Sequence, residues 1–348
     1  MQNKMKYIFE LNHPKHYYQF KYVMKLLKNN GHEILVLARD KDVLLKLLQE
    51  EQVSYKIFGE HKKSIAGKIF NSFSLIFQYS SIVRKFNPDI IVSKASCYGV
   101  LMTKLFRKKS VIFPDSEIVF LTNKIVVPLS DLVITPETFE LNYGKKHKKV
   151  PGFFENCYLH PTIFAPNEEI LAQYDIKRPY AVFRFIGWSA NHDVGNSGFS
   201  NEQKMQFAEA LKGKLNLYIS SEKELPAELE SYKLSTPAAA IHSVLFYADL
   251  YLGDSQTMAT EAAILGTPAI RSNSFVGPND MSNFKLLENK YDLLKNLSSA
   301  EDVLSAITDF SENSRKKEWQ KKREKYLEAA GDSNQIIANI LEEICRAD

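Results

Sequence analysis

Short apolar runs rich in β-branched and aromatic residues alternate along the chain with stretches of helical periodicity. In the first half, the expected strands are residues 7–11, 33–38, 55–57, 90–92, 111–113 and 132–135. The helices expected between them are residues 17–30, 42–50, 65–86, 98–106 and 119–127. Strands that alternate with helices in this way are typical of a doubly wound parallel sheet.

This rhythm stops near Val150, where Pro151 and Gly152 are followed by two further prolines, and we place a linker there. It resumes with strands 180–185, 215–219, 250–252 and 269–271, with helices 202–211, 237–247 and 258–265, and with a mostly helical end, 283–344. A chain of 348 residues is long enough for two domains. We therefore expect an α/β protein with two Rossmann-like domains, residues 1–150 and residues 151–348, the second including the C-terminal helices.

The charged residues are unevenly divided between these halves. Residues 1–150 contain 25 Lys and Arg against 13 Asp and Glu, a net charge of +12. Residues 151–348 contain 20 against 28, a net charge of −8, and the two halves sum to +4. The excess of cations favours an anionic partner for the first half, although a solvated lysine-rich face would give the same count.

The composition, 45% apolar and 25% charged, is that of a globular protein. No apolar run reaches the roughly 18 residues that span a bilayer, and no signal peptide precedes the first strand, so we expect a cytoplasmic protein. The three cysteines, Cys97, Cys157 and Cys345, are widely separated, which argues against a disulfide framework and against a zinc site.

The first candidate site follows the strand at 250–252. The junction between this strand and the next helix is Gly253-Asp254-Ser255-Gln256-Thr257. Such a junction presents free backbone N–H groups and the positive end of a helix, which suit a pyrophosphate. Glu261 lies one helical turn after Thr257, where a carboxylate can accept hydrogen bonds from a ribose. The plain alternative is that a hydroxyl caps the helix and Glu261 complements its dipole.

Two common nucleotide motifs do not occur in the sequence. There is no G-x-G-x-x-G fingerprint and no glycine-rich loop that ends in Gly-Lys-Ser or Gly-Lys-Thr. We therefore expect no dinucleotide cofactor and no P-loop ATPase.

The second candidate site is the long, glycine-rich segment 186–198 after the strand at 180–185. It contains Trp188, His192 and Asp193, and Arg184 precedes it on the strand. A cation and a histidine at this position could neutralise a departing diphosphate. The alternative is that Trp188 and His192 only pack the loop onto its own domain.

The third candidate site follows the first strand, where His13 and His16 flank Pro-Lys. Histidine is a natural general base for a sugar hydroxyl at neutral pH. Asp115 and Glu117, after the strand at 111–113, are alternative acid or base groups. The Asp-Lys-Asp run at 40–42 resembles a metal-binding pair, but we interpret it as a helix start and expect no metal.

Several segments together carry a resemblance to known proteins. They are His-Pro-Lys-His at 13–16, Gly-His-Glu at 31–33, Ala-Arg-Asp at 38–40, Pro-Gly-Phe-Phe-Glu at 151–155, Tyr-Leu at 158–159, Trp-Ser-Ala-Asn-His-Asp-Val-Gly at 188–195, and the stretch from Thr257 through Glu-Ala-Ala at 261–263 to Leu-Gly-Thr-Pro at 265–268. They resemble a family of prokaryotic GT-B-like proteins catalogued as a domain of unknown function. More distantly, the chain is similar to the non-hydrolysing UDP-N-acetylglucosamine 2-epimerases and to the N-acetylglucosaminyltransferase that makes lipid II. The resemblance implies a GT-B fold, two Rossmann-like domains facing a central cleft, with an acceptor in the first and a nucleotide-sugar in the second.

Departures from these relatives help to choose a reaction. The epimerases have carboxylates after the strand equivalent to 90–92 and in the helix equivalent to 119–127, where this chain has Ser-Lys-Ala-Ser and Leu-Thr-Asn-Lys. Epimerisation needs acid and base groups on both faces of the sugar carbon, and this set is incomplete here. The transferase relatives have a glycine-rich loop after the first strand, which His-Pro-Lys-His replaces.

We therefore expect a metal-independent glycosyltransferase that uses a nucleotide-sugar, with a UDP-sugar as the expected donor, and a hydroxyl of a glycan or lipid-linked acceptor in cell-envelope polysaccharide synthesis. His16 or His13 would be the base. The diphosphate would be held by Ser255, Thr257, the helix that starts at Met258, and either Arg184 or His192, and the ribose by Glu261. The alternatives are a nucleotide-sugar 2-epimerase and a non-catalytic nucleotide-sugar-binding protein.

The helix at 65–86 has an apolar stripe, with Ile65, Ile69, Phe73, Ile76 and Val83 at helical spacing. Such a stripe is usually the core-facing side of a Rossmann helix. Phe70, Leu75 and Phe77 lie beside the stripe, near Lys62, Lys63, Lys68 and Arg84. Aromatic and basic surface together would suit a peripheral location on the inner face of an anionic membrane.

Overall fold

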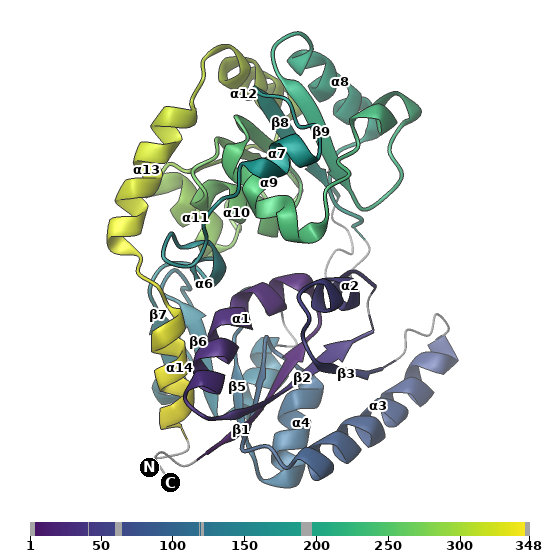
Figure 1. The fold of residues 1–348 in the computed structure, drawn as a ribbon, viewed down its shortest axis with the longest axis vertical. Helices are drawn as coiled ribbons and strands as arrows, with labels where there is room; N and C mark the ends of the chain where they lie inside the picture. The colour runs from purple at the N-terminus through teal and green to yellow at the C-terminus, as the bar shows by residue number, and fades with distance from the viewer. Residues whose placement is uncertain are drawn as a thin grey trace. The chain divides into compact units, whose positions relative to one another are not determined.

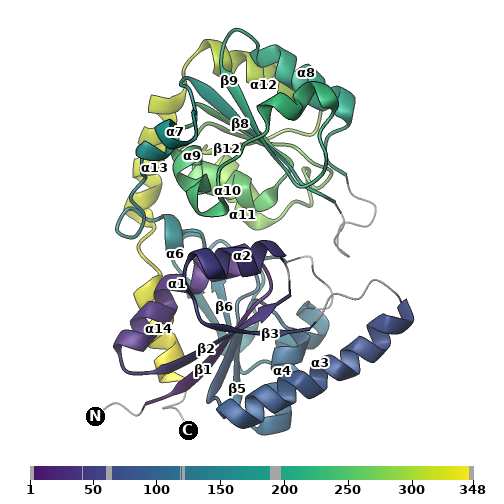
Figure 2. The ribbon, with the colours of Figure 1, turned by 45° about the vertical axis from the view of Figure 1, so that its right-hand side comes forward.

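The structure is a computed structural model that describes residues 4–40, 42–59, 65–117, 119, 122–188 and 197–344. It contains two sheets in which all the strands run parallel, one of seven strands and one of five, with helices packed around each (Figures 1 and 2). The expectation of two doubly wound parallel sheets is confirmed. Within the described residues, no helix is both long enough and apolar enough to cross a membrane.

The first sheet has the strand order β3-β2-β1-β4-β5-β6-β7. Its strands are β1 (Lys6–Leu11), β2 (Glu33–Arg39), β3 (Tyr55–Phe58), β4 (Ile90–Ser93), β5 (Lys109–Ile112), β6 (Leu132–Pro136) and β7 (His147–Val150). The accompanying helices are α1 (Pro14–Asn29), α2 (Asp42–Glu50), α3 (Ile65–Phe86), α4 (Cys97–Phe106), the π-helix η1 (Thr122–Val126), α5 (Val127–Leu129), the 3-10 helix η2 (Gly144–Lys146) and α6 (Asn156–Leu159).

The second sheet has the strand order β12-β11-β10-β8-β9. Its strands are β8 (Tyr180–Phe185), β9 (Asn216–Ser221), β10 (Leu250–Gly253), β11 (Ala269–Arg271) and β12 (Leu294–Asn296). The accompanying helices are α7 (Glu169–Gln173), α8 (Asn201–Leu211), the 3-10 helices η3 (Ala227–Tyr232) and η4 (Ala238–Ala240), α9 (Ile241–Tyr247), α10 (Gln256–Ile264), α11 (Ser282–Asn289), α12 (Ala300–Glu312) and α13 (Lys316–Ala329). The helix that follows them, α14 (Asn334–Glu343), lies with the first sheet.

The chain forms two compact units, one of residues Met1–Tyr158 with Asp332–Asp348, and one of residues Leu159–Gly331. The sequence-based division assigned all of 151–348 to the second domain, and the structure differs because helix α14 returns to the first sheet. There the Tyr7 hydroxyl donates to the Leu341 carbonyl at 3.3 Å, and His32 Nε2 lies 3.1 Å from Glu342 Oε1. These partners are more than 300 residues apart in the chain, so their contact could not be predicted from a local sequence pattern.

Helix α13 packs against the end of helix α10, and side chains of α13 donate hydrogen bonds to the last carbonyls of α10. Arg323 Nε donates to the Ile264 carbonyl at 3.0 Å, and Gln320 Nε2 donates to the carbonyls of Leu265 and Gly266 at 3.1 and 3.0 Å. Gly266 has a φ of +71°, and a Cβ there would lie 2.9 Å from Arg323 Cδ. The Leu-Gly-Thr-Pro run thus ends α10 and leaves room for α13.

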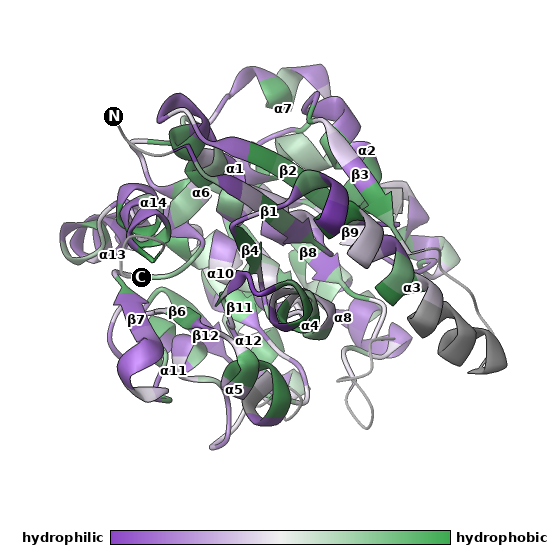
Figure 3. Ribbon diagram, turned by 90° about the horizontal axis from the view of Figure 1, so that it is seen from below, coloured by the Kyte–Doolittle hydropathy of each residue, from purple (hydrophilic) through white to green (hydrophobic). Residues whose placement is uncertain are grey.

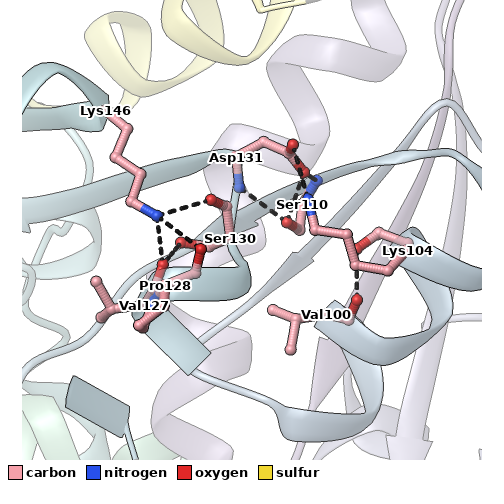
Figure 4. A network of polar contacts seen from close by, with 9 residues as sticks. Val100, Lys104, Ser110, Val127, Pro128, Ser130, Asp131 and Lys146 are labelled. Atoms are coloured by element: carbon pink, nitrogen blue, oxygen red, sulfur yellow. Dashed lines mark hydrogen bonds and ion pairs between the residues drawn. The ribbon is translucent and has the colours of Figure 1, made fainter. Parts of the chain in front are cut away.

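The short helix α5 is held by a polar network that links it to neighbouring strands (Figure 4). Lys146 Nζ donates to the carbonyls of Val127, Pro128 and Ser130 at 2.6, 3.1 and 3.0 Å, which satisfies acceptors that so short a helix leaves open. Asp131 accepts hydrogen bonds from the backbone N–H and hydroxyl of Ser110, both at 2.8 Å.

The apolar stripe of helix α3 is mainly a core feature in the part whose side chains are described. Leu75 and Val83 are buried in a cluster with Phe58 and Tyr79, and Ile76 packs against it. Leu75 was expected beside the stripe on exposed surface, and that was wrong because it faces this cluster. Phe77 is 81% exposed, as expected. The side chains of residues 65–73, and Lys62 and Lys63, lie outside the described part.

The α13 contact predicts a difference between two glycine substitutions. Gly266→Ala should lower the free energy of unfolding by about 1 kcal/mol or more beyond Gly213→Ala, because a methyl group at 266 also meets Arg323. Gly213 is a matched control, since its φ is +75° but a Cβ there meets nothing within 4 Å. Urea unfolding followed by circular dichroism measures both, and equal losses would contradict the role assigned to the α13 contact.

Candidate functional site

The junction between β10 and α10 has the form expected of an anion-binding strand–helix turn. Ser255 is the N-cap, in an extended conformation, and its hydroxyl accepts the Met258 N–H at 3.3 Å. Gln256 and Thr257 occupy the first turn and are partly exposed. A Cβ at Gly253 would lie 2.3 Å from the Tyr251 hydroxyl oxygen and 2.9 Å from the Arg184 carbonyl oxygen, so no larger residue fits without a shift. The positive end of α10 therefore begins directly after β10, and its first turn is partly exposed.

Glu261, on the same helix, is more buried than the sequence suggested. It is 5% exposed, and its Oε1 is 3.3 Å from Nε2 of His242 on helix α9. A buried carboxylate is expected to have such a partner. Sequence reasoning missed His242, because the two residues are 19 positions apart and nothing local connects them.

The loop after β8 is tied to the β10–α10 junction by Asp254. Its Oδ1 accepts the Ile186 N–H at 2.9 Å, and its Oδ2 accepts the indole N–H of Trp188 at 3.0 Å. Burial raises the pKa of Asp254, and these two hydrogen bonds oppose the rise. Two of the predicted sites are thus brought together by Asp254, which the sequence analysis placed in the junction without assigning it a role. His192 and Asp193 lie outside the described residues.

Arg184 is in register with Gly253 on the neighbouring strand, but its charge is already paired. Its guanidinium donates to the Ser220 hydroxyl at 2.8 Å and forms an ion pair with Glu222. Glu222 also accepts the Gly187 N–H at 2.8 Å. Arg184 therefore holds the start of the loop, a positioning role that its place on the strand did not reveal.

In the first unit, a cluster of charged side chains lies where β1, β4 and β5 end. Lys94 Nζ is 3.1 Å from Asp115 Oδ2, and Lys15 Nζ is 3.4 Å from the same oxygen and 2.8 Å from Glu155 Oε1. Lys94 is buried, also donates to Gln19 at 2.8 Å, and lies 4.4 Å from the centre of the Phe154 ring. Sequence reasoning identified Asp115 as a candidate but not the lysines, although Lys94 directly follows a strand.

These lysines control the charge of Asp115. Burial alone would raise the pKa of Asp115, but Lys94 and Lys15 outweigh burial and hold the pKa well below its ordinary value. Burial lowers the pKa of Lys94, and the attraction of Asp115 opposes that change. Asp115 is therefore a carboxylate at every physiological pH, with 40% of its side chain exposed.

Both predicted histidines bond to backbone N–H groups. His13 is the N-cap of α1 and its Nδ1 accepts the Lys15 N–H at 3.1 Å, while His16 Nδ1 accepts the Asn12 N–H at 3.1 Å. Burial, and next the charge of Lys94, lower the pKa of His16 well below its ordinary value. Neutral His16 thus carries its proton on Nε2, so it can take up a proton only if the Asn12 bond is broken.

The remaining candidates lie elsewhere. Glu117 accepts the Glu140 N–H at 2.8 Å. Helix α2 begins at Asp42, as the interpretation of residues 40–42 required. Among the residues that the structure describes, no group of three or more His, Cys, Asp or Glu side chains is placed to hold a metal ion.

Comparison with known proteins places the chain in a family and in a fold. A family model described as "Protein of unknown function (DUF354)" matches residues 6–328. An uncharacterized protein of Methanocaldococcus jannaschii is 22% identical over 286 residues, which are 75% of this chain and 80% of that protein.

Two solved structures have a similar fold at low sequence identity. One is UDP-GlcNAc 2-epimerase from Neisseria meningitidis bound to UDP-GlcNAc, with a TM-score of 0.67 at 13% identity, covering 97% of this chain and 100% of that one. The other is the spinosyn forosaminyltransferase SpnP, with a TM-score of 0.64 at 14% identity, covering 98% and 99%. These likenesses establish a GT-B type fold, as the resemblance in the sequence implied. The chain belongs to the family described as "Protein of unknown function (DUF354)".

Proposed function

We propose that this protein is a metal-independent glycosyltransferase that moves a sugar from a nucleotide-sugar, with a UDP-sugar as the expected donor, to a hydroxyl of a glycan or lipid-linked acceptor in cell-envelope polysaccharide synthesis. Proteins of similar fold include one bound to UDP-GlcNAc and one named as a sugar transferase. Fold alone does not separate transfer from epimerisation, so the choice depends on the side chains.

The donor is assigned to the second unit. Ser255, Gln256 and Thr257 surround the positive end of α10, which suits the negative diphosphate. Asp254 fixes the Trp188 loop beside this junction. Glu261 follows on the same helix, and we assign its carboxylate to the ribose hydroxyls.

The observation that carries the choice of reaction is the pair of lysines around Asp115. Epimerisation begins with removal of a proton from a sugar carbon, which needs a strong base. Lys94 and Lys15 stabilise the charged form of Asp115 and so make it a weak base. A hydroxyl that attacks an anomeric carbon becomes acidic as the new bond forms, so a weak base suffices for transfer.

In the proposed reaction, the acceptor oxygen bonds to the anomeric carbon as the bond from that carbon to the diphosphate breaks. The bonding electrons leave with the diphosphate, and the acceptor proton passes to Asp115. His16, which carries its proton on Nε2, is assigned to orienting the acceptor by hydrogen-bond donation. The two histidines expected as bases are therefore proposed in other roles, with His13 as the helix cap.

The donor assignment predicts the effect of Glu261→Gln on nucleotide binding. The variant should bind UDP about 10- to 100-fold more weakly in isothermal titration calorimetry, because a charged hydrogen-bond acceptor for ribose is lost. Glu342→Gln is a matched control, since Glu342 is also buried against a histidine but lies in the first unit. Unchanged UDP affinity in folded Glu261→Gln would remove Glu261 from the site. A thermal-shift screen with UDP, GDP, CDP and TDP identifies the nucleotide beforehand.

The reaction assignment predicts that no deuterium enters the donor sugar. The protein is incubated with UDP-GlcNAc in heavy water, and carbon 2 of the sugar is followed by NMR. Only an epimerase must break the C2–H bond, so we expect the proton signal at this carbon to persist. Exchange for deuterium that depends on the protein would establish the epimerase alternative instead.

A lipid-linked acceptor would place the protein at a membrane surface, and we propose that the first unit makes this contact. Helices α3, α4 and α5 and the π-helix η1 carry exposed apolar side chains, and Figure 3 shows hydrophobic stretches on α4 and α5. The residues are Phe77, Leu101, Leu105, Ile125 and Leu129. Exposed Arg84, Arg107 and Lys124 lie on or next to these elements. Apolar and basic side chains together favour an anionic lipid surface.

This proposal predicts sedimentation with anionic phosphatidylglycerol vesicles, but not with neutral phosphatidylcholine vesicles, at about 50 mM salt, with release as salt screens the charges. Phe77→Ser combined with Leu105→Ser should leave the protein in the supernatant. Met205→Ser combined with Tyr232→Ser is the control, because it removes exposed apolar side chains of the second unit. A wild-type protein that stays in solution would exclude this membrane contact.

A further inference from the structure

Arg39 is the last residue of β2 and lies at the carboxyl edge of the first sheet. Its guanidinium carbon is 5.0 Å from the centre of the Phe58 ring and 5.4 Å from the centre of the Tyr98 ring. Phe58 is fully buried and Tyr98 packs against the same core cluster, so neither ring moves freely. The two rings therefore hold a half-buried cation in a fixed place.

Gly59 keeps space for this guanidinium. It follows Phe58 with a φ of +81°, and a Cβ at this position would lie 2.8 Å from Arg39 Nη1. Its backbone N–H donates to Gln78 Oε1 at 3.4 Å, which ties this turn to helix α3. A side chain at residue 59 would have to displace Leu75 or the guanidinium.

Among the residues that the structure describes, the Arg39 side chain contacts the two rings but makes no hydrogen bond and no ion pair. Glu10 acts on it electrostatically, but Glu10 accepts the Tyr79 hydroxyl at 3.1 Å and the Asn12 amide at 3.3 Å. Burial raises the pKa of Glu10 and so disfavours its negatively charged form. Two arginines on strands of the second sheet differ, since Arg184 pairs with Glu222 and Arg271 with Asp280.

We propose that Arg39 binds an oxyanion, a phosphate or a carboxylate group, of the acceptor substrate. A guanidinium presents paired N–H donors that match two oxygens of such a group, and its own charge is then compensated. The strand β2 is adjacent to β1, which leads into helix α1 with Lys15 and His16 in its first turn. Arg39 is therefore at the same edge of the sheet as the charged cluster around Asp115. That this oxyanion belongs to the acceptor substrate rests on the proposed function, whereas the binding of an oxyanion by Arg39 does not.

The test follows the side-chain N–H signals of the whole protein, labelled with 15N-arginine, by NMR. Inorganic phosphate is added at constant ionic strength, and acetate is added in a second series. Arg39→Gln assigns the signal of Arg39 by its loss. We expect a saturable shift of this signal, and the tighter of the two anions identifies the acceptor group. Arg84, exposed and 6.0 Å from a single ring, serves as the internal control.

A second pair of variants tests the space beside the guanidinium. Gly59→Ala should weaken binding about tenfold or more, as expected when paired hydrogen bonds are misaligned. Gly31→Ala should not, because Gly31 has a φ of +87° in the same unit with nothing within 4 Å of a Cβ.

The titration of the wild-type protein is enough to overturn the proposal. It would do so if the Arg39 signal did not shift, or if all arginine signals shifted together. Because no nucleotide is present in these titrations, their failure is distinguishable from a failure of UDP binding at Glu261.

Discussion

Parallel pairing of the strands places all their carboxyl ends at one edge of each sheet, and the polar clusters of this protein depend on that constraint. In the second sheet, β8 and β10 are neighbours, so the turn after one can bond to the turn after the other. Asp254 makes this bond to Ile186 and Trp188. In the first sheet, the ends of β1, β4 and β5 bring Lys15, Lys94 and Asp115 into one ion-paired cluster.

Charge compensation distinguishes the cations of these edges from one another. Lys94 is buried, and its ion pair with Asp115 offsets part of the cost of burial. Arg184 is neutralised by Glu222 in the same way. The excess of positive charge in residues 1–150 therefore overstates what is available to a ligand, since part of it already serves to hold carboxylates. Arg39 differs from Lys94 and Arg184, because it is held in position by two rings and its proposed ionic partner is a ligand.

The end of the chain contributes to both units. Helix α13 caps the last carbonyls of α10 through Gln320 and Arg323, and so supports from behind the helix whose beginning forms the proposed donor site. Helix α14 then packs on the first sheet through Leu341 and Glu342. The C-terminal helices are thus part of the framework of each unit and not an appendage of the second domain.

The sequence by itself determined the parallel α/β architecture, the two sheets, the family and most element positions, because apolar runs and glycine turns are local signals. It missed β7 (His147–Val150) and β12 (Leu294–Asn296), which are short and contain Lys or Asn in place of an apolar run. Pairing with β6 and β11 makes these segments strands, and that is a property of the sheet.

Only the tertiary structure decided the chemical state of the candidate residues. The sequence located Asp115, His16, Arg184 and Glu261 near strand or helix ends, yet it could not show their partners. Lys94 holds Asp115 ionised, the Asn12 N–H fixes the proton of His16 on Nε2, and His242 lies 3.3 Å from the Glu261 carboxylate. Protonation and pairing depend on distances of about 3 Å between groups that are far apart in the chain, and such distances exist only once the sheets have formed.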